Sequence, residues 1–155
     1  MIRVSKLADY GIVLMTYAAR QPYGMLHTAR ELARASELPL PTVSKVLKAL
    51  ARGGLLVSQR GTHGGYSLAH TSDAISVADI ITAVDGPVSL TQCTELPRSP
   101  CDFESVCPVR TNWALINRTV LAAMEKLSLA DMAGPLTTVR AGKRRSNVLA
   151  IVGSP

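Results

Sequence analysis

The chain has 155 residues, of which 47% are hydrophobic and 18% charged, and its net charge is +6. This composition allows one sizeable core with an appended element. No run of eighteen apolar residues occurs, so we expect no membrane span. Asp9 interrupts the apolar stretch near the N-terminus, which argues against a signal peptide. We therefore expect a cytoplasmic protein with reduced thiols.

The basic residues are spread unevenly along the chain. Residues 1–92 carry nine Lys/Arg against six Asp/Glu, a balance of +3. Residues 93–133 carry four against five, a balance of −1, and residues 134–155 add four basic residues and no acid. A basic balance suits a nucleic-acid partner, although many other proteins share it.

Two helices are predicted before residue 37. The first follows Ser5, a capping residue, and stops before Pro22. The second spans 28–36, because Thr28 and Glu31 have the spacing of a capping box. The apolar residues expected on one face of the first helix are Leu7, Tyr10, Gly11, Leu14 and Ala18.

A third helix is predicted from Pro41, which suits a first helical turn, to the stop at Gly53 and Gly54. Its apolar residues follow helical spacing and should face the core: Val43, Val46, Leu47 and Leu50. Its outer face carries small polar and basic residues: Thr42, Ser44, Lys45, Lys48 and Arg52. Residues 28–52 therefore have the pattern of a helix-turn-helix, with an ordinary solvated helix pair as the alternative.

The next segment favours DNA binding. LLVSQR and YSLAH are predicted strands, and the GTHGG between them permits a hairpin turn. A helix-turn-helix followed by such a hairpin is a winged-helix arrangement, whose tip can reach phosphates or the minor groove. The expected DNA-binding residues are Thr28, Pro41, Thr42, Ser44, Lys45, Lys48, Arg60 and His63.

Two further helices are predicted, so the fold is expected to be mostly α with a small β-hairpin wing. One begins at a capping box of Ser76 and Asp79 and ends near Gly86. The other is long, from Pro108 to about Leu127, and a short capped turn follows it from Ser128 to Gly134. The long helix has a broad apolar stripe, so we expect it to form a homodimer rather than to pack only on its own domain. The residues expected at the interface are Trp113, Ile116, Val120 and Met124.

All three cysteines, Cys93, Cys101 and Cys107, lie in one irregular, polar stretch with the spacing C-x7-C-x5-C. Buried core thiols are one interpretation. A disulfide framework fits an odd count poorly. Ligation of a metal or cluster is the favoured interpretation, because thiolates select zinc, copper(I) or iron–sulfur clusters. A fourth ligand must then come from elsewhere.

Taken in order, these motifs resemble those of the iron–sulfur-responsive winged-helix transcription regulators of the IscR type, and most of all the regulator of SUF-system cluster assembly. The likeness covers roughly residues 1–133. It is carried by SKLADYG, the helix-turn-helix 28–52, RGTHGGYSL, SVADIITAVDG, the three cysteines, CPVRTNW and SLADM.

The resemblance implies a homodimer on a palindromic operator of double-stranded DNA, with one cluster per subunit, 2Fe-2S or 4Fe-4S. It implies that Cys93, Cys101 and Cys107 ligate the cluster. The chain departs from the family in a longer first cysteine interval and in Arg110, which stands where some members have a histidine. The favoured fourth ligand is Asp9 of the partner subunit, whose position resembles that of an aspartate in related nitric-oxide sensors. A carboxylate of the loop, from Glu95, Asp102 or Glu104, and water or another donor are the alternatives.

We thus expect a winged helix-turn-helix domain at 1–86, a cluster-binding loop at 87–107, a dimerisation helix with a short cap at 108–133 and a basic tail at 134–155. The expected function is a DNA-binding regulator, as a repressor, that senses cluster status and controls cluster-assembly genes. A nitric-oxide or iron-availability sensor of the same fold, or a zinc-stabilised or cofactorless module, is the alternative. No catalytic signature occurs, so we expect neither enzyme activity nor a small-molecule substrate.

Overall fold

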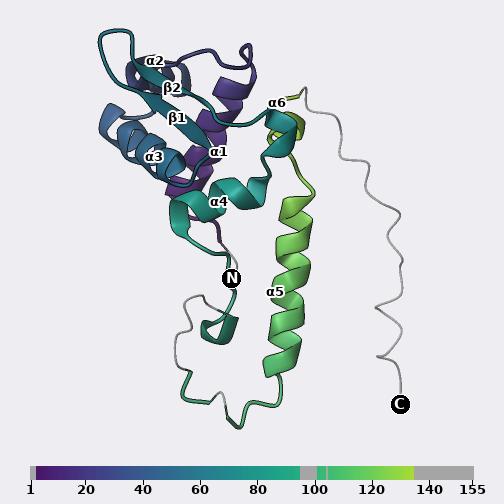
Figure 1. Cartoon of the computed structure of the whole chain (residues 1–155). Coiled ribbons are helices and arrows are strands. Elements are labelled where there is room, and N and C mark those ends of the chain that lie inside the picture. The colour runs from purple at the N-terminus through teal and green to yellow at the C-terminus, as the bar shows by residue number, and fades with distance from the viewer. Residues whose placement is uncertain (1–2, 95–100, 104, 135–155) are drawn as a thin grey trace, which may run out of the picture.

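The computed structural model describes residues 3–94, 101–103 and 105–134, with helices and one small antiparallel sheet (Figure 1). This confirms the expected mostly helical fold. In Figure 1, helices α1 to α4 and the hairpin gather at one end, and α5 extends away from them. The elements are α1 (Lys6–Ala19), α2 (Ala29–Ser36), α3 (Leu40–Arg52), β1 (Leu56–Gln59), β2 (Gly65–Leu68), η1 (Ser72–Ala74), α4 (Val77–Asp85), η2 (Gln92–Thr94), α5 (Arg110–Glu125) and α6 (Leu129–Ala133).

Short local bonds define where several helices begin. At α2, the Thr28 hydroxyl accepts from the Glu31 amide at 3.2 Å, and the Glu31 carboxylate accepts from the Thr28 amide at 2.7 Å. Capping boxes of the same kind begin α4 and α6, at Ser76–Asp79 and Ser128–Asp131. The bonds from the Thr28 backbone and side chain lower the pKa of Glu31, because they stabilise its ionised form.

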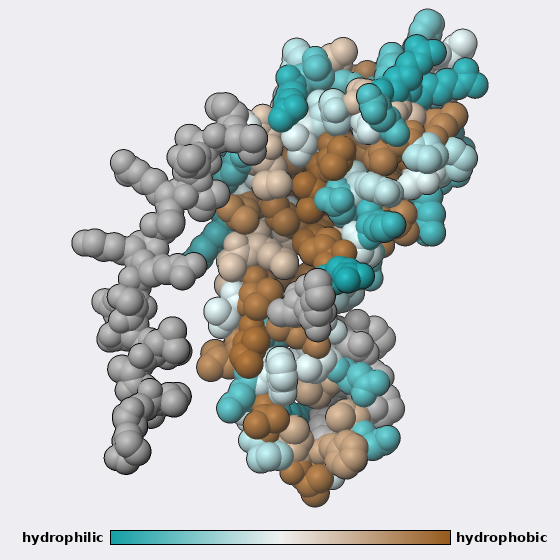
Figure 2. Space-filling model, turned by 180° about the vertical axis from the view of Figure 1, so that it is seen from behind, coloured by the Kyte–Doolittle hydropathy of each residue, from teal (hydrophilic) through white to brown (hydrophobic). Residues whose placement is uncertain are grey.

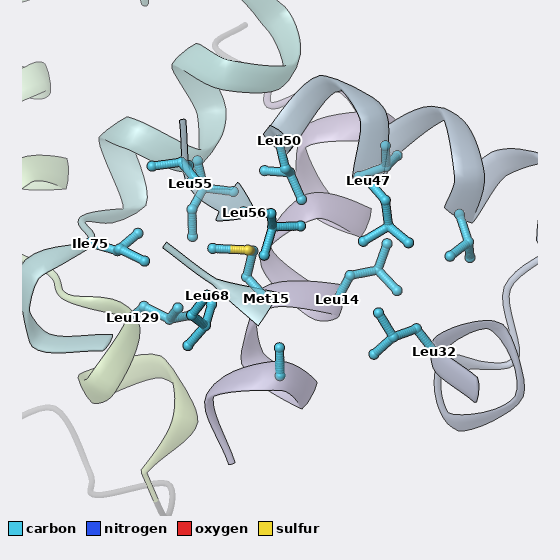
Figure 3. Close-up of a cluster of buried hydrophobic side chains, with 14 residues drawn as sticks. Leu14, Met15, Leu32, Leu47, Leu50, Leu55, Leu56, Leu68, Ile75 and Leu129 are labelled. Atoms are coloured by element: carbon cyan, nitrogen blue, oxygen red, sulfur yellow. The ribbon is translucent and has the colours of Figure 1, made fainter. Parts of the chain in front are cut away.

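The main core lies where α1, α3, the hairpin and α6 meet (Figure 3). Leu14 and Met15 of α1 and Leu129 of α6 are each at most 1% exposed. Burying one such side chain stabilises the fold by roughly 1.5–3 kcal/mol. The predicted stripe of α3 is confirmed as its buried face, with Val43, Val46, Leu47 and Leu50.

The predicted face of α1 packs on the core, but the buried surface of this helix is wider than predicted. Leu7 and Tyr10 are only half-buried, whereas Ala8 and Met15 are buried. The reason is α4, which packs along α1 beside Gly11. A Cβ at Gly11 would lie 3.1 Å from Cγ2 of Val84, so the glycine lets the two helices approach closely. Nearly all of α1 is apolar, and spacing alone does not show which side α4 covers.

Smaller differences concern the ends of elements. The long helix begins at Arg110, with Val109 as its cap, rather than at Pro108. Its C-terminal end is tied to the core, because the Leu129 amide donates to the Ile75 carbonyl at 2.7 Å and the Val77 amide to the Leu127 carbonyl at 2.9 Å. No helix in the described part of the chain has the length and apolar character needed to cross a membrane.

Candidate nucleic-acid interface and cysteine segment

Helix α3 presents a polar face opposite its buried stripe. Pro41, Lys45 and Lys48 are exposed, and Thr42 and Ser44 are half-buried. The buried stripe fixes how α3 is rotated against the core. The polar face is therefore the one that is available to enter a groove of DNA. Thr28 lies at the start of α2, where its hydroxyl accepts from the Glu31 amide.

A groove of about 340 Å³ lies between α3 and the hairpin. Cationic side chains from successive turns of α3 and hydroxyls from the two strands line it: Lys45, Lys48, Arg52, Ser58 and Tyr66, together with Ala51. Cations beside hydroxyl donors suit a phosphate backbone. Arg52, Ser58 and Tyr66 were not among the DNA-binding residues predicted from the sequence. Arg52 could have been found from its spacing, because it follows Lys45 by seven residues, or two helical turns, and so lies on the same face of α3.

The hairpin carries Arg60 and His63 in its exposed tip. Strand β2 of the hairpin is held by His27, which comes just before α2 and pairs with Tyr66, in the second residue pair from the tip. The His27 amide donates to the Tyr66 carbonyl at 2.9 Å, and the Tyr66 amide donates back at 2.8 Å. A Cβ at Gly65 would lie 2.8 Å from the His27 carbonyl oxygen, so this close pairing needs a glycine. The wing is therefore attached to the helix-turn-helix twice: by the chain that leads from α3 into β1, and by the pairing of Tyr66 with His27 before α2.

The cysteine segment joins α4 to α5. Cys93, Cys101 and Cys107 are half-buried free thiols, and the Sγ of Cys93 lies 3.2 Å from the Thr91 hydroxyl. Among residues 3–94, 101–103 and 105–134, no group of three or more His, Cys, Asp or Glu side chains is placed to hold a metal ion. Of the loop carboxylates, Asp102 is exposed, whereas Glu95 and Glu104 lie outside the described residues.

Asp9, the other candidate ligand, is exposed in the first turn of α1. Helix α5 has no buried residue. Its apolar residues are open to solvent at Trp113, which is 37% exposed, and Ile116, which is 43% exposed. Val120 and Met124 are half-buried, and Met124 packs against a small cluster of its own chain, formed by Ala8, Val77 and Ile81. Figure 2 shows hydrophobic residues exposed along the part of the molecule that α5 forms.

A helix-turn-helix with a cationic outer helix, followed at once by a hairpin with a basic tip, defines a winged-helix DNA-binding protein. The Rrf2 family, described as iron-dependent transcriptional regulators, matches residues 4–135. The chain belongs to this family.

Sequence similarity to named relatives supports this membership. A candidate HTH-type regulator of Mycobacterium tuberculosis is 29% identical over 133 residues, 86% of this chain and 82% of the relative. An rrf2-like regulator of Rhodobacter capsulatus is 32% identical over 133 residues, 82% of this chain and 87% of the relative. These relatives are transcriptional regulators, not enzymes.

Solved structures with the same fold include two named regulators. CymR, the global cysteine regulator of B. subtilis, has a TM-score of 0.65 and 27% identity, covering 86% of this chain and 97% of its own. IscR of T. potens has a TM-score of 0.59 and 25% identity, covering 84% and 85%. The likeness extends beyond the winged helix to most of the described chain.

Proposed function

We propose that the protein is a homodimeric regulator whose operator binding responds to an iron–sulfur cluster held by Cys93, Cys101 and Cys107. The observation that carries the proposal is the placement of the cysteines. Three free, half-buried thiols lie on the connection that leads from α4 of the winged-helix domain into α5. A change in the state of this connection acts on both parts at once.

The donor set fits such a cluster, because iron–sulfur centres are normally held by thiolates. Bound there, the cluster would supply a redox-active and chemically labile group. Three thiolates leave one position unfilled, and the described residues of one chain supply no complete set. We propose Asp9 of a second copy as the fourth ligand, because it is the one acidic residue of α1 and its side chain is exposed. An oxygen donor is a poorer partner for a thiolate-bound metal than sulfur, so this corner would exchange easily.

We propose the homodimer because of the exposed apolar surface of α5. This helix exposes Trp113, Leu115 and Ile116, and no residue of it is buried within the chain. A second copy related by a twofold axis would cover this surface and place two recognition helices on a palindromic site. Genes for cluster assembly are the proposed targets, because of the sequence resemblance to the SUF regulator.

The test is anaerobic purification followed by absorption spectroscopy and iron and sulfide analysis. A brown protein with iron and sulfide in each subunit, whose operator affinity changes when the cluster is removed, is the expected result. A colourless protein that holds zinc would overturn the proposal. Asp9→Ala should keep the fold and dimer but alter the spectrum and speed cluster loss in air. If Glu104→Ala does so instead, the fourth ligand is in the loop.

A cofactorless regulator that responds to a small molecule is the second candidate. One observation favours it, a groove of about 660 Å³ between α3, α4 and α5, whose lining includes Arg52, Thr94 and Asn117. Metal-free protein whose operator affinity is unaffected by iron and sulfide would support this alternative.

A further inference from the structure

One side chain of α5 holds the segment that leads to the first cysteine. Asn117 is half-buried. Its Oδ1 accepts from the Leu90 amide at 3.0 Å, and its Nδ2 donates to the Val88 carbonyl at 3.2 Å. The amide group thus satisfies a donor and an acceptor of the same short stretch of backbone, in the manner of a neighbouring strand. Sequence reasoning gave no role to this residue.

The chain between this contact and Cys93 is short and internally bonded. The Thr94 amide donates to the Thr91 carbonyl at 2.9 Å, and the Thr91 amide donates to the Thr94 hydroxyl at 3.2 Å. Cys93 lies inside this closed turn, with its Sγ beside the Thr91 hydroxyl. Cys93 comes three positions after Leu90, a reach of at most about 11 Å. The position of the thiol therefore depends on where Asn117 holds Leu90.

The other end of the segment is held by α4. The Gly86 amide donates to the Thr82 carbonyl at 3.0 Å and ends the helix. Gly86 has a φ of +91°, which turns the chain away from α4 toward α5. The backbone from Gly86 to Thr94 is therefore attached in turn to α4, to α5 through Asn117, and to itself. Val88 also packs beside Met124 of α5 on a small apolar cluster, and the Asn117 contact supplies the directional hydrogen bonds that set the register of the segment along α5.

We infer that Asn117 is a positioning residue, which fixes the turn carrying Cys93 on α5 and so orients the first thiol of the cysteine segment. The cluster part of this inference rests on the proposed function, whereas the positioning of the thiol does not. Asn117 need not contact a bound group to act in this way.

The first experiment measures the thiol itself. In the Cys101→Ser/Cys107→Ser background, Cys93 is the one remaining thiol of the chain, and its alkylation by N-ethylmaleimide can be followed by mass spectrometry without any metal. Asn117→Ala should speed this reaction at least about fivefold, because two hydrogen bonds that restrain the turn are lost. Asn117→Asp keeps an acceptor for Leu90 and loses the donor to Val88, so its rate should fall between.

Asn112→Ala is the matched control, an exposed asparagine on the same helix, and it should leave the alkylation rate unchanged. Circular dichroism and thermal melting report whether each variant is folded. An unchanged rate for folded Asn117→Ala and Asn117→Asp would overturn the inference. So would a rate that rises equally in the Asn112 control.

The second experiment uses the full set of cysteines, reconstituted anaerobically. Asn117→Ala should change the absorption or electron paramagnetic resonance spectrum and shorten the lifetime of the cluster in air. A spectrum and lifetime identical to those of the unaltered protein would overturn the positioning of a ligand. If the unaltered protein takes up no iron, the proposed function fails, and the alkylation rates alone decide the role of Asn117.

Discussion

The contact between α3 and α4 depends on a missing side chain. Gly53 follows the last residue of α3, and a Cβ there would lie 2.5 Å from the Cβ of Ala83 in α4. Carbon atoms pack best at about 3.5–4.0 Å, so Gly53→Ala would force the two helices apart by about 1 Å or more. Its φ of −74° and ψ of 0° suit alanine, so the cost comes from packing alone. We expect a loss of about 1–3 kcal/mol in the free energy of unfolding, the usual cost of an overpacked contact.

A double-mutant cycle isolates this contact. Ala83→Gly alone should cost about 1 kcal/mol, because glycine is a poor helix former. In the pair Gly53→Ala/Ala83→Gly, one Cβ again lies between the helices, so the total loss should stay near 1 kcal/mol instead of the roughly 2–4 kcal/mol expected from the sum. Urea unfolding at one fixed protein concentration measures all four proteins. A coupling energy below about 0.5 kcal/mol would refute the argument.

Gly54 supplies the matched control for this cycle. It has a φ of +77°, and a Cβ there would meet no atom within 4 Å. Gly54→Ala should therefore cost about 1–2 kcal/mol through backbone strain, and its effect should add to that of Ala83→Gly. If the Gly54 pair couples as strongly as the Gly53 pair, the coupling does not come from the contact between α3 and α4.

Three further predictions concern the wing, the dimer and acid stability. Arg60→Ala should weaken operator binding and reduce the salt dependence by about one phosphate contact, whereas Thr62→Ala should not; equal slopes in fluorescence anisotropy would contradict a wing contact. Ile116→Glu should give monomers in sedimentation velocity, because a buried unpaired charge opposes dimerisation; a folded dimer would place the interface elsewhere. Bonds from Ser128 lower the pKa of Asp131, so their stabilisation should be complete above the ordinary value of 3.8 and fade as the pH falls below it. Asp131→Asn should therefore be less stable at pH 7 in thermal melts and closer to the unaltered protein at pH 3; an equal deficit at both would contradict this.

Features that depend on near neighbours in the chain could be predicted from the sequence. The capping box at Thr28 and the stripe that begins at Val43 involve residues three to seven positions apart, and the structure confirms both. The buried face of α1 was partly missed, because it depends on where α4 packs beside Gly11. Spacing in one helix carries no information about a partner that lies seventy residues further along the chain.

In the candidate site, too, the sequence predicts what depends on near neighbours and misses what depends on distant segments. The polar face of α3 follows from its apolar stripe, so Lys45 and Lys48 could be placed from the sequence. Ser58 and Tyr66 line the same groove only because the hairpin folds back toward α3. Asn117 lies among apolar residues on an amphipathic helix, where an asparagine has no distinctive pattern. Its two bonds span 27 and 29 positions of sequence, and local patterns do not extend that far.

The pairing of His27 with Tyr66 separates the wing into two strands that a third stretch of chain holds and a tip beyond them. The strands are held as far as the residue pair at Tyr66, whereas the tip turns at Gly61, with a φ of +110°, and closes at Gly64, where a side chain would meet the Gln59 carbonyl. Insertions or exchanges between these two glycines would change how far the tip reaches without moving α3. Exchanges among the tip residues would thus alter the surface that the wing presents, while the framework that holds α3 stays in place.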